Sequence, residues 1–330
     1  MEIKDKAEHI NDILKKYLPK QPYAEGGIED AMEYSVMAGG KRLRGIMLLE
    51  SFRLYNSDPD LEKNLVEPYI AAMEFIHAYS LVHDDLPSMD NDMYRRGKLT
   101  THAKYGHAMG VLTGDALLNY AFETMTKAAV KLSGMRGEIA AELAMRACRA
   151  MSVIAEKAGF SGMIGGQVMD VCSEKTAMNE MSGSENSMAD TNNANSGDIN
   201  DNSQDLNFLY KIYELKTSRL FQASLCAGAI LAGAEEKQIT AMDEIGYCIG
   251  EAFQIKDDIL DTTADFEQLG KDIGSDAKNN KKTVASILGI ENAQNLVEKY
   301  LDRAAGLINE QSGNKSFFNE LIEYLRIRNK

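Results

Sequence analysis

Large apolar side chains recur at helical spacing along most of this 330-residue chain. Clear examples are residues 70–83, where Ile70, Met73 and Ile76 are interleaved with alanine, and residues 112–132. Segments that alternate apolar and polar residues, as strands do, are scarce. All five prolines fall within the first 90 residues, so the other 240 residues are free of this helix breaker. The pattern predicts an all-α protein, with the helices packed as a single large bundle.

One segment departs from this pattern. Residues 173–205 are rich in Asn, Ser, Asp and Gly and nearly free of large apolar side chains, a composition typical of a disordered surface loop. A linker between two domains is the alternative, and the chain is long enough for two. Because the motifs on both sides of the segment point to one site, we predict a single domain over residues 1–330.

Charge and hydropathy narrow the possible functions. The chain carries 50 Asp and Glu against 36 Lys and Arg, a formal net charge of -14, which argues against binding to nucleic acid or to an anionic membrane surface. No apolar run approaches the length of about 18 residues that indicates a membrane span. The N-terminus lacks the apolar stretch of a signal peptide, and the four cysteines form no CxxC pair. We therefore expect a cytoplasmic protein without stable membrane insertion.

Two aspartate clusters stand out, DDLPSMD at residues 84–90 and DDILD at residues 257–261. Magnesium prefers oxygen ligands and is commonly held by one or two carboxylates together with substrate phosphates. In the first cluster Pro87 should end or kink the helix, and this break could turn Asp90 back towards Asp84. In the second, the first and last aspartates are four residues apart and should point into the same space. The two clusters together suggest an Mg²⁺-dependent enzyme that acts on diphosphates.

Histidine and arginine residues accompany the first cluster. His77 lies two helical turns before Asp84, and Arg95 and Arg96 follow soon after the cluster ends. Nearer the N-terminus, the segment GGKRLRG places three cations beside two glycines, which let a phosphate group approach the backbone closely. For each motif alone the alternative is a solvated helix face or a basic helix start. Their combination favours a site for phosphorylated ligands.

Seven motifs in a fixed order resemble the trans-type isoprenyl diphosphate synthases, specifically the bacterial farnesyl diphosphate synthases. The resemblance runs from about residue 26 to residue 330, interrupted by the polar segment. The motifs are GGKRLR at 39–44, EFIHAYSLVHDDLPSMDNDMYRRG at 74–97, YGHAMGVLTGDALL at 105–118, GGQVMD at 165–170, KT at 216–217, FQIKDDILD at 253–261 and LGKDIGSD at 269–276. The resemblance implies the helical isoprenoid synthase fold, a single large bundle around a central active-site cavity, and a homodimer.

The resemblance also implies roles for individual residues. Three Mg²⁺ ions per active site would be held by Asp84, Asp90 and Asp257, with Asp85, Asp258 and Asp261 in support. The allylic diphosphate would bind Arg95, Lys216, Thr217, Gln254 and Lys271, and isopentenyl diphosphate would bind Lys41, Arg44, His77 and Arg96. Polar lining would come from Gln167 and Asp170, and Thr217 would lie near the reacting carbons.

The implied reaction is a prenyl transfer, in which isopentenyl diphosphate is condensed with dimethylallyl or geranyl diphosphate. Ionisation of the allylic diphosphate gives an allyl cation and a highly anionic leaving group, which metals and cationic side chains stabilise. Isopentenyl diphosphate attacks the cation, and loss of a proton gives the longer product. A terpene cyclase would share the fold but has no use for the second-substrate residues. A non-catalytic subunit would normally have lost one or more of the carboxylates.

Product length is expected to depend on Tyr79 and Ser80, about one and a half helical turns before Asp84. In the family, an aromatic residue just upstream of the first cluster, combined with the two-residue expansion Pro87-Ser88, accompanies a C15 product. We therefore expect farnesyl diphosphate. If Tyr79 is instead a packed core aromatic, a C20 product, geranylgeranyl diphosphate, becomes the alternative.

Overall fold

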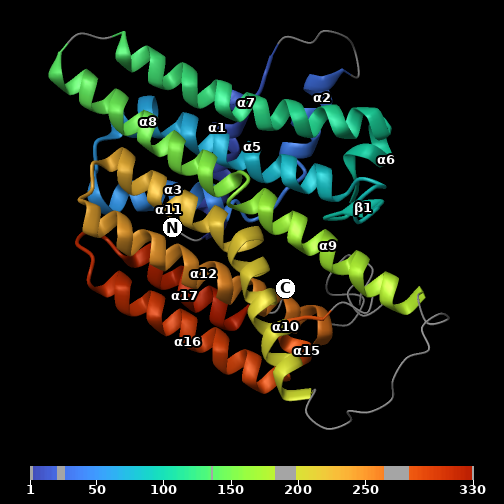
Figure 1. The fold of residues 1–330 in the computed structure, drawn as a ribbon. Helices are drawn as coiled ribbons and strands as arrows, with labels where there is room; N and C mark the ends of the chain where they lie inside the picture. The colour runs from blue at the N-terminus through green and yellow to red at the C-terminus, as the bar shows by residue number, and fades with distance from the viewer. Residues whose placement is uncertain (1–2, 21–26, 135–136, 183–197, 264–281, 329–330) are drawn as a thin grey trace.

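The computed structural model describes residues 3–20, 27–134, 137–182, 198–263 and 282–328, and these are almost entirely helical (Figure 1). Up to residue 158 the helices are α1 (Ile3–Tyr17), α2 (Ile28–Val36), α3 (Leu43–Tyr55), α4 (Pro59–Leu61), the π-helical turn η1 (Glu62–Val66), α5 (Glu67–Asp84), α6 (Thr101–Tyr105), α7 (His107–Ser133) and α8 (Glu138–Ala158). They are followed by α9 (Met163–Ser182), α10 (Asp198–Tyr213), the π-helical turn η2 (Glu214–Ser218), α11 (Arg219–Ala232), α12 (Glu236–Thr263), α15 (Val284–Leu288), α16 (Ile290–Asn309) and α17 (Ser316–Ile327). The prediction of an all-α protein is confirmed.

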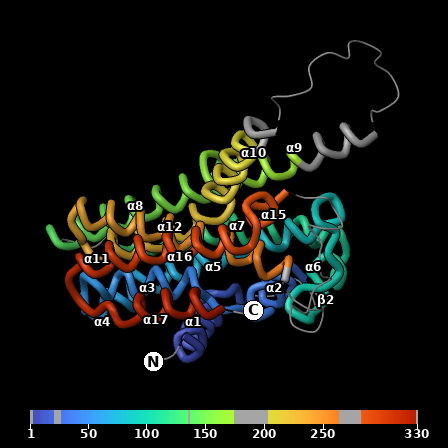
Figure 2. The backbone as a smooth tube through the Cα atoms, turned by 90° about the horizontal axis from the view of Figure 1, so that it is seen from below, coloured from blue at the N-terminus to red at the C-terminus, as the bar shows by residue number. Residues whose placement is uncertain are grey.

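The centre of the bundle is formed by α5 and α11. From Leu220 to Ala232 every residue of α11 is buried, as expected of a helix with apolar and small side chains on all sides. It packs on α3, α8 and α12, while α5 packs on α3 and α7. A side chain at Gly228 would overlap the carbonyl group of Leu48, so this glycine allows α11 to approach α3 closely. Helices from both sides of the polar segment therefore share one core, and Figure 2 shows them as stacked layers.

The prediction of a loop over residues 173–205 is wrong at both ends of this polar segment. α9 continues to Ser182, and α10 already begins at Asp198. Residues 174–181 contain Glu, Lys, Ala and Met, which are strong helix formers, so they extend a helix that starts further back at Met163. Residues 183–197 lie outside the described part of the chain.

A short hairpin follows the first aspartate cluster and was not predicted. Its strands, β1 (Tyr94–Arg95) and β2 (Lys98–Leu99), pair antiparallel, with Tyr94 opposite Leu99. The two turn residues, Arg96 and Gly97, have φ angles of 54° and 73°. Left-handed backbone at both central positions matches the two-residue turns that join twisted strands. Strands of two residues carry no periodic signal, so sequence patterning could not find them.

None of the described helices combines the length and the apolar content that crossing a bilayer requires. The four cysteines, Cys148, Cys172, Cys226 and Cys248, are all free thiols.

Candidate active site

The first aspartate cluster lies where α5 ends. The last residue of α5 is Asp84, three residues before Pro87, so the predicted helix end is confirmed. Beyond it the chain folds back in tight turns, and the Asp90 amide donates a hydrogen bond to the Asp84 carbonyl group at 2.9 Å. The expected return of Asp90 towards Asp84 is thus present in the backbone. The Asp90 side chain is exposed, whereas that of Asp84 is half-buried.

The electrostatic environment of Asp84 favours a bound cation. Burial raises the pKa of Asp84 to about 6, and Asp90 acts in the same direction. Lys216 and Arg95 oppose this shift by stabilising the carboxylate. Since the net pKa shift is upward, the ionised form of Asp84 is under-stabilised by the protein alone.

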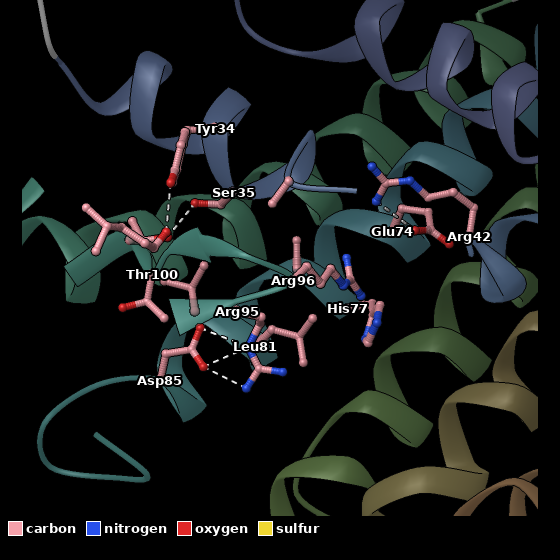
Figure 3. Close-up of a pocket in the computed structure, with 15 residues that line it drawn as sticks. Tyr34, Ser35, Arg42, Glu74, His77, Leu81, Asp85, Arg95, Arg96 and Thr100 are labelled. Carbon is pink, nitrogen blue, oxygen red and sulfur yellow. Dashed lines mark hydrogen bonds and ion pairs between the residues drawn. The ribbon is translucent and has the colours of Figure 1, made fainter. Parts of the chain in front are cut away.

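Asp85, next in sequence, points in a different direction. Its side chain is 5% exposed and holds Arg95, with 2.7 Å from Arg95 Nε to Asp85 Oδ1 and 2.6 Å from Nη2 to the same oxygen. Figure 3 shows this pair among the residues that line a pocket between α2, the end of α5 and the hairpin. The pocket has a volume of about 40 Å³. The structure therefore gives Asp85 the role of fixing Arg95, which is a predicted diphosphate ligand. A supporting role for Asp85 at a metal stays a prediction.

Arg96 occupies the tip of the hairpin in a left-handed conformation that is costly for any residue other than glycine. Its guanidinium group donates a hydrogen bond to the carbonyl of Gly39. A Cβ atom at Gly40 would lie 2.5 Å from Arg96 Nη1, so any side chain at this position would displace the Arg96 guanidinium group. Gly40 thus makes space for Arg96, which is a more specific role than the one expected from the sequence.

Arg44 and His77 form the next part of the basic group. Arg44 Nη1 lies 3.3 Å from His77 Nε2, and the guanidinium group stacks 4.7 Å from the ring centre of Phe221. Burial, followed by the positive charges of Arg44 and Arg96, holds the pKa of His77 well below its usual range, so the imidazole is neutral. Figure 3 shows Arg96 beside His77. The structure therefore brings three of the four predicted isopentenyl diphosphate ligands together.

Two buried nitrogens in this group have no hydrogen-bond partner among the described residues. They are Arg44 Nε and His77 Nδ1. Buried polar groups are normally hydrogen-bonded, so such atoms need an explanation. An anionic ligand would provide an acceptor for the Arg44 guanidinium group. The fourth predicted ligand, Lys41, is exposed at the edge of the group, with its ammonium 5.2 Å from the ring centre of Tyr324.

Sequence reasoning missed the pair that supports this basic loop. Arg42 is buried and has a left-handed backbone, with φ of 52°. Its Nη1 lies 3.4 Å from Glu74 Oε2, and Glu74 Oε1 accepts a hydrogen bond from the Gly45 amide at 2.8 Å. Glu74 thereby ties both ends of the segment between Arg42 and Gly45 to α5. Glu74 lies within the apolar run of α5, and a charged residue inside an apolar helix was the signal that could have identified it.

The second aspartate cluster lies near the C-terminal end of α12. Asp257 and Asp261 are one turn apart on this helix, in agreement with the prediction. Asp257 forms an ion pair with Arg328 near the C-terminus, with 2.6 Å between Nη2 and Oδ1. The guanidinium group of Arg328 also stacks 4.3 Å from the ring centre of Phe253. No sequence motif indicated a role for Arg328.

Asp258 is buried and belongs to a hydrogen-bonded chain. It accepts hydrogen bonds from the hydroxyl of Tyr213 and, at 3.2 Å, from Gln254 Nε2. Gln254 Oε1 in turn accepts a hydrogen bond from Thr217 at 2.7 Å. Tyr213 was not predicted, and its hydroxyl also accepts a hydrogen bond from the Val284 amide at 3.2 Å. Asp258 thus orients Gln254 and, through it, Thr217.

Lys216 links the two halves of the site. Its ammonium lies 2.6 Å from Asp170 Oδ2 on α9, so two predicted residues meet here. It also lowers the pKa of Asp84, which places its charge near the first cluster. On the other side of the site, burial lowers the pKa of Arg44, and the negative charge of Asp257 in the second cluster opposes this shift. The two aspartate clusters and the basic groups therefore converge on one region.

The remaining predicted residues fall in or near this region, with one exception. Gln167 Oε1 is buried and has no hydrogen-bond partner among the described residues. Tyr79 is buried, packs edge-on against His83 with 5.9 Å between ring centres, and its hydroxyl likewise lacks a described partner. The Ser80 hydroxyl donates to the His77 carbonyl of its own helix at 3.0 Å. Lys271 lies outside the described residues.

The carboxylates suit magnesium better than a metal with an all-protein coordination shell. Within the described ranges, no three His, Cys, Asp or Glu side chains converge closely enough to form such a shell. Mg²⁺ needs no such group, because it retains waters and takes substrate phosphates as ligands. Burial and the nearby Asp90 both raise the pKa of Asp84, so the protein alone stabilises its carboxylate poorly. A cation bound between these residues would stabilise the ionised carboxylate.

Comparisons with known proteins agree with this geometry. The family model for polyprenyl synthetase matches residues 25–324. The chain is 34% identical over 302 residues to a farnesyl diphosphate synthase of Geobacillus stearothermophilus, with 92% of this chain and 88% of that protein covered. It is 37% identical over 303 residues to a geranylgeranyl diphosphate synthase of Cyanophora paradoxa, with 91% and 86% covered.

Solved structures extend the comparison. A geranyltransferase of Helicobacter pylori, complexed with magnesium and isoprenyl diphosphate, superposes with a TM-score of 0.70 at 27% identity, with 98% of this chain and 93% of that chain covered. An FPP/GFPP synthase of Zymomonas mobilis gives a TM-score of 0.73 at 28% identity, with 99% and 97% covered. The sequence and the fold of this chain both show that it belongs to the polyprenyl synthetase family of prenyltransferases.

Proposed function

We propose that this chain is a farnesyl diphosphate synthase that condenses isopentenyl diphosphate first with dimethylallyl diphosphate and then with geranyl diphosphate. The observation that carries the proposal is the convergence of two carboxylate clusters with two separate basic groups. Lys216 and Arg95 lie near the first cluster, and Arg44 and Arg96 surround the neutral ring of His77. Two basic groups match a reaction that binds two diphosphates.

The first basic group would bind the allylic diphosphate. Lys216 and Arg95 are held in place by Asp170 and Asp85 and would share their charge with the incoming phosphates. Asp84, Asp90 and Asp257 would hold Mg²⁺, which when bound neutralises the diphosphate as the carbon–oxygen bond breaks. The Thr217 hydroxyl, oriented by Gln254, would lie near the carbon that becomes cationic.

The second group would bind isopentenyl diphosphate through Arg44, Arg96 and Lys41. The buried Arg44 Nε would then gain the acceptor that the described residues do not supply. The double bond of isopentenyl diphosphate attacks the allyl cation and forms the new carbon–carbon bond. The proton released from the adjacent carbon passes to the departing diphosphate, so the protein needs no nucleophile and forms no covalent intermediate.

The C15 product is proposed from the position of Tyr79. The ring is buried five residues before Asp84, on the helix that carries the first cluster. Phe75 lies one turn deeper and packs against Tyr120, with 5.8 Å between ring centres. Relatives named for C15 and for C20 products are similarly close to this chain, so geranylgeranyl diphosphate is the second candidate.

A homodimer is proposed as the working form. Large apolar side chains are exposed on three helices that follow one another in the chain, among them Leu112 and Val130 on α7, Ile139 on α8 and Val168 on α9. Exposed apolar surface of this kind is what an interface between subunits would bury. Sedimentation of the purified chain would give the mass of the particle, and a monomer at micromolar concentration would contradict this part of the proposal.

Product analysis tests the whole proposal. The purified chain is incubated with Mg²⁺, labelled isopentenyl diphosphate and, in turn, dimethylallyl, geranyl or farnesyl diphosphate. Products are then identified by chromatography and mass spectrometry. Accumulation of C15 from the first two primers is the expected result. Growth to C20 would keep the enzyme class and replace the product, while no condensation with any primer would contradict the proposal and favour a non-catalytic subunit.

A further inference from the structure

The π-helical turn η2 carries two of the proposed active-site residues and directs them to different helices. Lys216 binds Asp170 on α9, and Thr217 binds Gln254 on α12. The turn is closed by a hydrogen bond from the Arg219 amide to the carbonyl of Glu214, five residues earlier. Relaxation to a regular α-helix would change the register by one residue, which corresponds to a rotation of about 100° around the axis. The direction of both side chains therefore depends on keeping this turn.

Two glycines, one on α9 and one on α12, lie against the backbone of η2. A Cβ atom at Gly166 on α9 would overlap the amide nitrogen of Lys216, and one at Gly250 on α12 would overlap the backbone of Ser218. Glycines allow such close approach, but they supply no directional bond that would hold the turn in one register.

The directional bond comes from a buried glutamate next to Gly250. Glu251 is 0% exposed, and its Oε1 accepts a hydrogen bond at 2.8 Å from the hydroxyl of Ser218, which is itself fully buried. The other carboxyl oxygen, Oε2, is buried and has no hydrogen-bond partner among the described residues. A buried carboxyl group with one unbonded oxygen destabilises the fold. Packing alone does not account for a glutamate here, because an apolar side chain of similar volume would avoid that cost.

We propose that Glu251 is a positioning residue, which through Ser218 fixes the register of η2 and thereby places Lys216 and Thr217 in the active site. The inference rests on the proposed function of this cavity and adds a residue that contacts neither substrate. It acts on the allylic side of the site, because η2 contributes its residues there. The isopentenyl diphosphate group around Arg44 should not depend on it.

The test compares three variants with the full-length wild-type chain. Glu251→Gln keeps an acceptor for Ser218, Glu251→Met removes it at similar volume, and Ser218→Ala removes the donor. For Glu251→Met we expect kcat to fall about tenfold, within the range seen when a reacting group is misplaced. The Michaelis constant for isopentenyl diphosphate should change less than twofold, and Tm should stay the same or rise. Glu251→Gln should stay within about threefold of wild-type kcat.

Two further readouts separate positioning from a general structural role. The double variant Glu251→Met/Ser218→Ala should lose no more kcat than either single variant, because both remove the same bond. Hydrogen exchange of the amides of residues 214–218 should be faster in Glu251→Met than in wild type, without any substrate present. Ser224→Ala is the matched control, since this buried serine of α11 bonds to the Leu220 carbonyl of its own helix.

Several results would overturn the inference. They are unchanged kcat in Glu251→Met, a Ser218→Ala variant no different from Ser224→Ala, or a fall in Tm with normal kcat per folded molecule. An inactive wild-type chain would instead contradict the proposed function. In that case, faster exchange of η2 in Glu251→Met would still support the positioning role, and unchanged exchange would refute it.

Discussion

Arg328 forms an ion pair with the carboxylate of Asp257, with 2.6 Å between Nη2 and Oδ1. The guanidinium group is largely buried and stacks on the ring of Phe253. Asp257 is the residue of the second cluster proposed to hold Mg²⁺. The same carboxylate oxygen cannot fully serve the guanidinium group and a metal ion at once. The ion pair therefore competes with metal binding, and metal binding should displace Arg328 from Asp257.

Replacing Arg328 with glutamine should accordingly strengthen metal binding. We expect the concentration of Mn²⁺ needed for half-saturation in the absence of substrate to fall about threefold, the size expected for loss of a competing ion pair. Electron paramagnetic resonance of free Mn²⁺ measures this directly. Arg303→Gln is the control, because Arg303 pairs with Glu244 on an exposed surface at 2.8 Å. Equal or weaker binding in Arg328→Gln would show that the two cations do not compete.

The contact between Gly40 and Arg96 predicts that a side chain at Gly40 selectively weakens the binding of isopentenyl diphosphate. Gly39→Ala and Gly40→Ala introduce the same methyl group at φ angles of 102° and 120°, so both strain the backbone. At Gly39 the new Cβ meets nothing within 4 Å, whereas at Gly40 it lies 2.5 Å from Arg96 Nη1. Gly40→Ala should therefore raise the Michaelis constant for isopentenyl diphosphate at least about tenfold more than Gly39→Ala.

Steady-state kinetics with each substrate varied in turn checks this difference. The Michaelis constant for the allylic substrate should change little in either variant. Similar defects in the two variants would mean that backbone strain, and not displacement of Arg96, is responsible.

Tyr79→Ala should lengthen the product by one isoprene unit. Removing the ring opens the space below the first cluster, and the next barrier is the pair of Phe75 and Tyr120 one helical turn deeper. The product should therefore shift from C15 to C20 and stop there, as measured by mass spectrometry of the dephosphorylated alcohols. Ser224→Ala is the control, because this serine is not among the predicted chain-length residues and its hydroxyl bonds within α11, so product length should not change. Unchanged C15 output from Tyr79→Ala would exclude Tyr79 as the floor.

Local sequence signals predicted much of the fold and of the site. The end of α5 before Pro87 follows from proline chemistry, and the return of Asp90 to Asp84 follows from that break. Helical spacing gave the all-α class because it repeats over many turns. The ends of the polar segment were mispredicted, since composition measures the lack of apolar burial and not the helix propensity of Glu, Lys, Ala and Met.

The relationships that sequence reasoning missed connect residues far apart in the chain. Nothing near Asp257 indicates that Arg328 will cover it, and nothing near Asp85 distinguishes a metal ligand from a partner of Arg95. Glu251, in a helix with many polar residues, is indistinguishable from a surface glutamate until the packing of α12 on η2 is known. Such roles depend on which face of a helix meets its neighbour, and single-sequence patterns do not determine that.

The environment of Glu251 predicts a pH dependence of stability. Burial raises the pKa of Glu251 to about 7, and the Ser218 hydrogen bond opposes this shift. The titratable groups that interact with it electrostatically are Tyr247, Cys248 and Asp258 of its own helix α12, and Tyr210, Glu214 and Tyr300 of the neighbouring elements. The folded-state pKa therefore lies above that of the unfolded chain, whose ordinary value is 4.5.

Because the folded-state pKa is the higher of the two, stability should fall as pH rises. Between the two pKa values the folded protein keeps a proton that the unfolded chain has lost, so the contribution of Glu251 to stability is fully present below pH 4.5. It decreases as pH rises and is lost above about pH 7. Glu251→Gln does not titrate and should escape this loss. Relative to wild type, its free energy of unfolding should rise from acidic pH to pH ~8 by on the order of 3 kcal/mol, as an upper bound.

Urea unfolding at about pH 5 and about pH 8, without divalent ions, measures the difference. Glu323→Gln is the matched control, because this carboxylate on α17 is mostly exposed and its loss should shift stability little at either pH. A wild-type chain that loses no stability relative to Glu251→Gln over this range would show that Glu251 is already ionised in the folded state. The carboxylate would then need a stabilising partner at Oε2, and the argument that this residue costs stability would be wrong.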